Sequence, residues 1–200
     1  LARENKKFIF GAVRKGARAA TYEQAIQWLV DAGLVYKVER VREPSMPLKF
    51  YADYEAFKLY AFDCGLLACL AEANPNAMLL GMNPFVEFKG AFSENFVLQQ
   101  LISAGCKSIY YYSKEKSTME IDFLCQTSEK IVPVEVKAEE NVKSKSFSTF
   151  IQQEFKEKSF KGLRCSMKPY IDQVWMENIP LYAVEAYIQA MRKNDVCFPC

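Results

Sequence analysis

Apolar residues recur at helical spacing near the start of the chain and then change to the alternation of strands. Residues 4–16 predict a basic helix, and residues 21–32 predict a second, amphipathic helix that Gly33 stops. Residues 34–41 alternate in polarity, which predicts a half-exposed strand, and residues 48–63 can return beside it after the turn REPSMP. The first part is therefore expected to fold as helix, turn, helix and hairpin.

This order is typical of a small winged helix-turn-helix with REPSMP at the tip of the wing, although an ordinary helical connector fits the same pattern. We assign residues 1–62 to a winged-helix-like domain. Residues 63–88 are expected to form a helical connector, with a short helix over 63–72 and a loop-rich stretch that contains two Asn-Pro steps.

The remaining residues, 89–200, mix helical and strand patterns, and we assign them to a second domain. The predicted order is a helix, three strands, a helix, two strands and a helix, over residues 90–105, 108–113, 119–126, 130–138, 146–158, 163–167, 179–184 and 185–194. This mixture indicates an α/β (α+β) fold in which helices flank a mixed sheet.

Composition excludes several kinds of chemistry. The 200 residues contain no histidine, so Ser–His triads, histidine acid–base catalysis and His-ligated zinc are excluded. Neither a P-loop nor a G-x-G-x-x-G motif occurs, so nothing in this chain indicates a nucleotide site. The net charge of +2 is too small to argue nucleic-acid binding from composition alone.

Other features bear on the cellular compartment of the protein and on the extent of the sequence. Its apolar runs are too short to span a bilayer, and its seven scattered cysteines fit reduced core residues, so we expect a cytoplasmic protein. The C-x-x-C at Cys197 and Cys200 has no second pair, and chance explains it. The sequence begins at Leu1 without an initiator Met, so we expect it to be a piece of a longer protein.

Charged side chains interrupt two strongly apolar strands. In a hairpin with a symmetric loop, residue i lies opposite residue 257 − i, so Asp122 would lie opposite Glu135 with Lys137 on the same face. The opposite face would collect the core residues Ile121, Phe123, Val134 and Val136. Two adjacent carboxylates repel each other unless a cation lies between them, and a divalent metal would supply more charge than Lys137 alone.

A third acid lies on the helix that precedes these strands. At about 100° per residue, Glu94 falls in the middle of the apolar stripe of residues 90–105. A carboxylate there is costly unless it meets a partner on the sheet. The alternative is that Glu94 only favours the positive end of its helix, which would suit a solvent-facing side chain.

A helix Glu, a strand Asp and an E-x-K in the next strand together resemble the core of the PD-(D/E)XK nuclease superfamily. The blocks KLYAFDCGLLACL, FKGAFSENFVLQQL, EIDFLCQ and VPVEVKAEENV are, more narrowly, similar to a C-terminal region of prokaryotic AAA-type ATPases. The resemblance covers residues 5 to 185 and implies a winged helix and a restriction-endonuclease-like domain behind an N-terminal P-loop ATPase domain that this chain lacks.

The resemblance also implies candidate functional residues. Glu94, Asp122, Glu135 and Lys137 would be catalytic, and the three acids would hold Mg²⁺ or Mn²⁺. The chain would then be a metal-dependent endodeoxyribonuclease acting on DNA. The alternatives are a non-catalytic DNA- or protein-binding module that regulates the ATPase, and a salt-bridged surface, which would explain Asp122 and Lys137 but not Glu94.

Basic residues give a weaker indication of nucleic-acid binding. Residues 1–20 carry an excess of Lys and Arg, and a second basic pair follows the tyrosine-rich strand 108–113. The tyrosines could stack on bases, but they are also ordinary strand residues. The candidate nucleic-acid-binding residues are Arg14, Lys15, Arg18, Lys114 and Lys116.

Overall fold

The computed structural model describes residues 7–9, 19–72, 88–114, 117–138, 145–154 and 161–195. The first part contains α2 (Ala19–Asp31), β1 (Val35–Val41), a 3-10 turn (Leu48–Tyr51), β2 (Ala52–Ala61) and α3 (Cys64–Leu70). The second part begins with α5 (Lys89–Ser103), β3 (Ser108–Ser113), β4 (Glu120–Gln126) and β5 (Ile131–Lys137). It continues with α6 (Lys145–Thr149), a π-helical turn (Phe150–Glu154), β6 (Gly162–Ser166), β7 (Ile171–Asp172), β8 (Met176–Pro180), a 3-10 turn (Leu181–Ala183) and α7 (Val184–Asp195).

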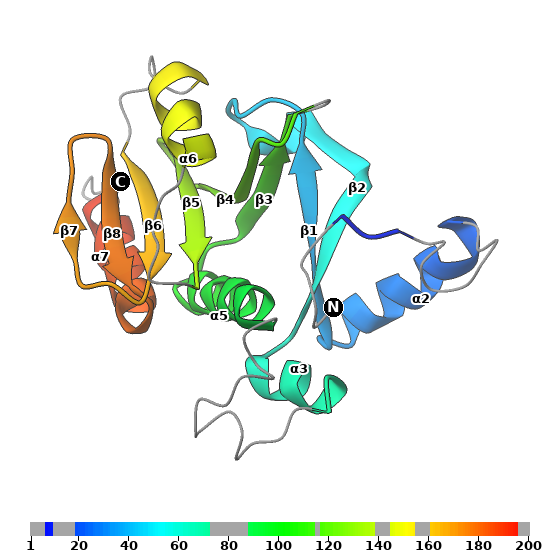
Figure 1. Ribbon diagram of the computed structural model, residues 1–200. Helices are drawn as coiled ribbons and strands as arrows, with labels where there is room; N and C mark the ends of the chain where they lie inside the picture. Colours follow the sequence, from blue (N-terminus) through cyan, green and yellow to red (C-terminus); the bar gives the residue numbers. More distant parts are fainter. Residues whose placement is uncertain are drawn as a thin grey trace.

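The described strands form one mixed sheet in the order β2-β1-β3-β4-β5-β6-β8-β7 (Figure 1). The β1–β2 hairpin joins this sheet because β1 also pairs with β3 in parallel, through Arg40 with Tyr111 and Val41 with Tyr112. Strands from both parts of the sequence thus share one backbone hydrogen-bond network. The predicted α/β fold with a mixed sheet is confirmed.

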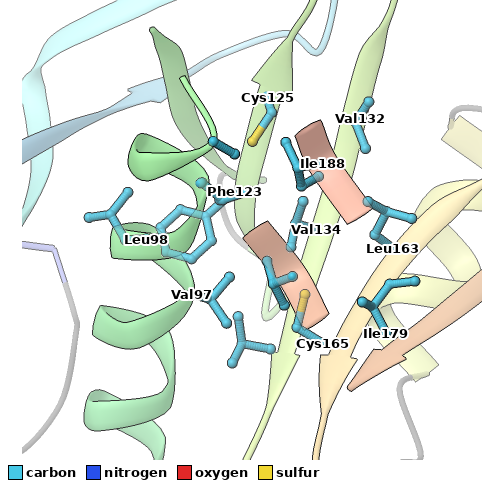
Figure 2. Packing of buried hydrophobic residues seen from close by; sticks show 14 of the residues in the cluster. Val97, Leu98, Phe123, Cys125, Val132, Val134, Leu163, Cys165, Ile179 and Ile188 are labelled. Atoms are coloured by element: carbon cyan, nitrogen blue, oxygen red, sulfur yellow. The ribbon is translucent and has the colours of Figure 1, made fainter. Parts of the chain in front are cut away.

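Helices cover both faces of the sheet. Under α5 and α7, Val97 and Ile188 pack against Phe123, and Figure 2 shows these side chains around the middle of the sheet. Under α6, Phe147 packs in a second cluster that contains Leu124. Because successive residues of a strand point to opposite faces, α5 and α7 lie on one face and α6 lies on the other. None of the described helices combines the length and hydropathy that a membrane span requires.

The predicted hairpin register is confirmed, but its two faces are not as predicted. Phe123 pairs with Val134 and Gln126 with Ile131, as the sum of 257 requires. Against β3, however, β4 contains one extra residue, because Tyr110 pairs with Leu124 whereas Tyr112 pairs with Ile121. This β-bulge moves Ile121 into the α6 cluster, so its predicted place beside Phe123 is wrong.

The basic helix predicted over residues 4–16 is wrong at the part that the structure describes. Residues 7–9 are not helical, and the Phe8 N–H donates a 2.7 Å hydrogen bond to the Phe57 carbonyl on β2. The Phe8 ring also stacks on Phe57 with a centroid distance of 5.4 Å. The segment follows the edge of the hairpin because that edge offers unpaired backbone groups.

Candidate functional site

A buried lysine that the sequence analysis missed lies among the predicted acids. Lys58, on β2, exposes 1% of its side chain, and its Nζ lies 2.5 Å from Glu120 Oε1 and 3.9 Å from Glu94 Oε2. The ammonium also stands 5.1 Å from the ring centroid of Tyr111. Burial lowers the pKa of Lys58, but Glu94, Asp122 and Glu120 together raise it by more, so the lysine stays charged.

Glu94 points toward the sheet, as the apolar stripe of its helix predicted. Its Oε2 accepts a 3.2 Å hydrogen bond from the hydroxyl of Tyr60, which lies two residues beyond Lys58 on β2. The next residue of α5 is Asn95, whose side chain holds both the N–H and the carbonyl of Ala61 at 2.9 and 3.2 Å. These bonds fasten α5 to the end of β2 and so position Glu94 beside the lysine.

Asp122 lies at the β-bulge and interacts with β5 through its side chain. Its Oδ2 accepts a 2.7 Å hydrogen bond from the backbone N–H of Val136, one residue past the position that the regular ladder would give it. Burial raises the pKa of Asp122, and Lys58, the Val136 N–H and Lys137 only partly oppose this effect. The bulge therefore places this carboxylate near Lys58, on the side of the sheet that α5 covers.

Glu135 is directed to the other face. It alternates with Val134 and Val136, which belong to the α5–α7 cluster, and its neighbour across the β5–β6 pair is Arg164. The Arg164 Nε donates a 2.9 Å hydrogen bond to Asn178 on β8. Glu135 is thus one end of a buried polar row that crosses three strands.

Lys137 connects the two sides at the end of β5. Its Nζ lies 2.7 Å from Glu135 Oε1 and also interacts electrostatically with the carboxylates of Asp122 and Glu94. Burial lowers the pKa of Lys137, but these acids, Glu135 foremost, raise it by more, so its pKa lies above the ordinary value. A lysine in this state is a poor base at neutral pH.

The predicted acids do not all lie on one face of the sheet. Oxygen donors suit Mg²⁺, but the donors must converge on one point. Glu94 and Asp122 lie on the face of the sheet that α5 covers, whereas the side chain of Glu135 projects from the opposite face. Within the described ranges, no group of three or more His, Cys, Asp or Glu residues could hold a metal ion. The positive charge that these carboxylates require is supplied by Lys58 and Lys137.

A basic pocket of about 520 Å³ lies where β1 meets β3. Its lining consists of Arg40, Arg42, Tyr112, Ser113 and Lys114. Of the predicted nucleic-acid-binding residues, Lys114 is placed here, next to two arginines that the sequence analysis did not select. The other four, Arg14, Lys15, Arg18 and Lys116, lie outside the described residues.

Asp53 on β2 holds the two arginines of this pocket. Its carboxylate accepts from Arg40 Nε at 3.1 Å and lies 3.4 Å from Arg42 Nη2. Burial would raise the pKa of Asp53, but the Arg40 hydrogen bond, the Glu55 N–H and Arg42 outweigh it and lower the pKa. Arg40 is largely enclosed, whereas Arg42 exposes 68% of its side chain. Three cationic side chains therefore line this pocket, and Asp53 holds two of them.

Comparison with known families divides the chain into two matched segments. Residues 89–183 match a domain of unknown function (DUF4143), a domain found in C-terminal regions associated with AAA-type ATPases. Residues 1–77 match a second domain of unknown function (DUF8612). Searches of curated proteins and of solved structures gave no match. The chain is therefore similar to two domains of unknown function, and its activity must be argued from its own residues.

Proposed function

We propose that this chain is a non-catalytic, DNA-binding module of an AAA-type ATPase. The observation that carries the first half of the proposal is Lys58, a buried cation between Glu94 and Glu120 and close to Asp122. A nuclease of the kind that the sequence suggested needs these carboxylates to attract a divalent cation. Here a side chain of the protein itself already neutralises them.

DNA is proposed as the ligand because of the pocket lined by Arg40, Arg42 and Lys114. Phosphate groups are bound mainly by clustered Arg and Lys side chains, and Arg presents a planar fork that fits phosphate oxygens. The salt bridges to Asp53 hold Arg40 and Arg42 side by side before any ligand arrives, which lowers the entropy lost on binding.

A Mg²⁺- or Mn²⁺-dependent PD-(D/E)XK endonuclease with a winged helix is the second candidate. It is favoured by the electrostatic proximity of Glu94, Asp122 and Lys137 and by the correct hairpin register. In that candidate Glu94, Asp122 and Glu135 would be the metal ligands, and Lys137 would assist them.

One experiment separates the two candidates. Calorimetric titration with Mn²⁺ and nicking of supercoiled plasmid in Mg²⁺ would be measured for the wild type and for Asp122→Asn. We expect no saturable heat and no nicking from either protein. Metal binding or nicking by the wild type that Asp122→Asn abolishes would establish the endonuclease and overturn the non-catalytic assignment.

A second experiment tests the ligand. Fluorescence anisotropy of a labelled DNA duplex would be measured at several salt concentrations for the wild type and for the double variant Arg42→Gln, Lys114→Gln. Each lost phosphate contact lowers the slope of log affinity against log salt by about one, so the double variant should lose about two. The matched control is Lys193→Gln, an exposed lysine of α7. Equal slopes for all three proteins would remove the pocket from the proposal.

A further inference from the structure

A small polar pocket lies at the end of the sheet where β3 begins. Its volume is about 280 Å³. Lys107 and Ser108 reach it from the turn that leads from α5 into β3, Ser128 from the turn between β4 and β5, and Arg192 from α7. Three segments that are distant in the sequence therefore converge on one hollow.

Arg192 is held in place beside the turn that follows α5. Its Nη1 donates a hydrogen bond to the carbonyl of Ala104, just past the end of that helix. The guanidinium can lie so close to the turn because residue 105 is glycine: a Cβ there would overlap Arg192, and the φ of Gly105 is +86°. A guanidinium carries five N–H donors, so the bond to Ala104 leaves most of them for another partner.

The positive charges of this pocket have no counter-charge in the part of the chain that the structure describes. Lys107 is exposed and Arg192 is half-buried, and neither forms an ion pair with a described carboxylate. Lys58 and Lys137, by contrast, each form a salt bridge. Glu129 follows Ser128 in the chain, but no Asp or Glu is among the described residues that line the pocket. Two neighbouring cations in this state favour an anionic ligand.

Two hydroxyl groups add further donors. Ser108 and Ser128 line the pocket, and neither hydroxyl forms a hydrogen bond to another described residue. The hydroxyl of Thr127, by contrast, accepts a 3.1 Å hydrogen bond from the Lys130 N–H and so holds the turn between β4 and β5. Donors that come from three segments suit a phosphate group, which presents three acceptor oxygens in different directions, better than a planar carboxylate with two.

We propose that this pocket binds the phosphate group of a small molecule. Arg192 and Lys107 bind the phosphate oxygens by charge-assisted hydrogen bonds, and the two serine hydroxyls donate to the same group. Because pockets for drug-sized ligands measure about 300–1,000 Å³, the rest of the ligand is small. The site is separate from the basic pocket of the proposed function: Ser108 begins β3 and lines the one, whereas Ser113 ends β3, roughly 16 Å away, and lines the other.

The test is isothermal titration calorimetry of the complete chain with two probes, inorganic phosphate and glycerol 3-phosphate. Sodium acetate at the same ionic strength is the control for non-specific anion binding. We expect saturable binding of phosphate and none of acetate. Tighter binding of glycerol 3-phosphate identifies a phosphomonoester as the ligand, and equal or tighter binding of inorganic phosphate identifies the free ion. Saturable binding of neither probe, or equal binding of acetate, would overturn the proposal.

Variants assign the binding to this pocket. Arg192→Gln should weaken the affinity for the tighter probe about tenfold, because a charge-assisted hydrogen bond is lost, and Lys107→Gln about threefold, because its ammonium is exposed. The matched controls are Lys193→Gln, on α7, and Arg42→Gln, in the other basic pocket, and both should bind like the wild type.

A purely structural role for Arg192 gives a different result. If Arg192 only caps the end of α5, Arg192→Gln lowers the melting temperature and leaves the phosphate affinity unchanged. Lys107→Gln removes an exposed side chain and should keep the wild-type melting temperature, so it decides the question if Arg192→Gln does not fold. Unchanged phosphate affinity in every folded variant of these two residues would overturn the proposal.

Discussion

At the scale of single residues, the site depends on a lysine that must remain charged in a place with almost no water. A buried cation is tolerated only when carboxylates surround it, and each of these carboxylates would repel the others without it. Lys58 with Glu94, Glu120 and Asp122 satisfies both conditions at once. The cluster is therefore most sensitive to the loss of Lys58, the cation that these carboxylates share.

Replacing Lys58 should therefore lower stability in a pH-dependent way. Removing one partner of a fully buried pair costs about 3–5 kcal/mol. Because Glu120 is partly exposed and can regain water, we expect Lys58→Met to cost about 2 kcal/mol in urea unfolding at pH 7. The folded-state pKa of Lys58 lies above its ordinary value of 10.5, so its contribution is complete below that pH and is lost as the pH rises through the folded-state pKa.

The matched control is Asp122→Asn. The asparagine oxygen can still accept the Val136 N–H, and burial raises the pKa of Asp122, which means that the fold disfavours its charged form. The control should therefore unfold at the same or a higher urea concentration than the wild type at pH 7. If Lys58→Met is as stable as the wild type at pH 7, Lys58 is not the cation that stabilises these acids.

At the scale of elements, α5 carries the site because Asn95 fastens it to β2. Asn95 is almost completely buried, and its side chain bonds the N–H and the carbonyl of Ala61. Asn95→Ala would leave two buried backbone groups without partners, which costs about 2–3 kcal/mol. We expect this loss in chemical denaturation. Gln100→Ala, on the same helix, is the control and should change stability by less than about 0.5 kcal/mol.

The pattern of apolar and polar residues predicted most strands of the sheet. It missed the β-bulge at Asp122 and the buried Lys58, which decide the site. The hairpin register followed from loop symmetry, and the inward direction of Glu94 followed from its place in the apolar stripe. The sequence of β4 alone does not indicate the bulge at Asp122, because the extra residue is recognised only from the pairing of β4 with β3. Pairing across strands that are distant in the sequence therefore determined which face Asp122 occupies, and a single strand could not show it.

The sequence does contain a signal for the burial of Lys58 and Asn95. Lys58 is the single charged residue in the run AFKLYA at positions 56–61, and Asn95 lies at the helical spacing of Ala91 and Leu98. A polar residue at an apolar position of a regular pattern predicts a buried partner. Their partners lie far away in the sequence: Lys58 meets Glu120 of β4, and Asn95 meets the backbone of Ala61.

At the scale of the whole molecule, the first and second parts share one sheet and one charged cluster. β1 lies between β2 and β3, and Val38 and Tyr60 of the hairpin belong to the same core as Val97 of α5. Lys58 neutralises acids that come from the second part. The division predicted from sequence, with residues 1–62 and 89–200 as separate domains, can be tested by asking whether the two parts unfold together.

We expect the complete chain to unfold in one cooperative transition, and residues 88–200 alone to show no cooperative transition. Without β1 and β2, the edge of β3 and the Tyr111 side chain would be exposed, and Glu94, Glu120 and Asp122 would lose their shared cation. Calorimetry of both proteins, with near-ultraviolet circular dichroism as a second probe, would measure this. A cooperative melt of residues 88–200 at the transition temperature of the complete chain would show that the second domain is independent. The sheet shared with the hairpin would then contribute nothing to its stability, and Lys58 could not be the residue that holds the acids together.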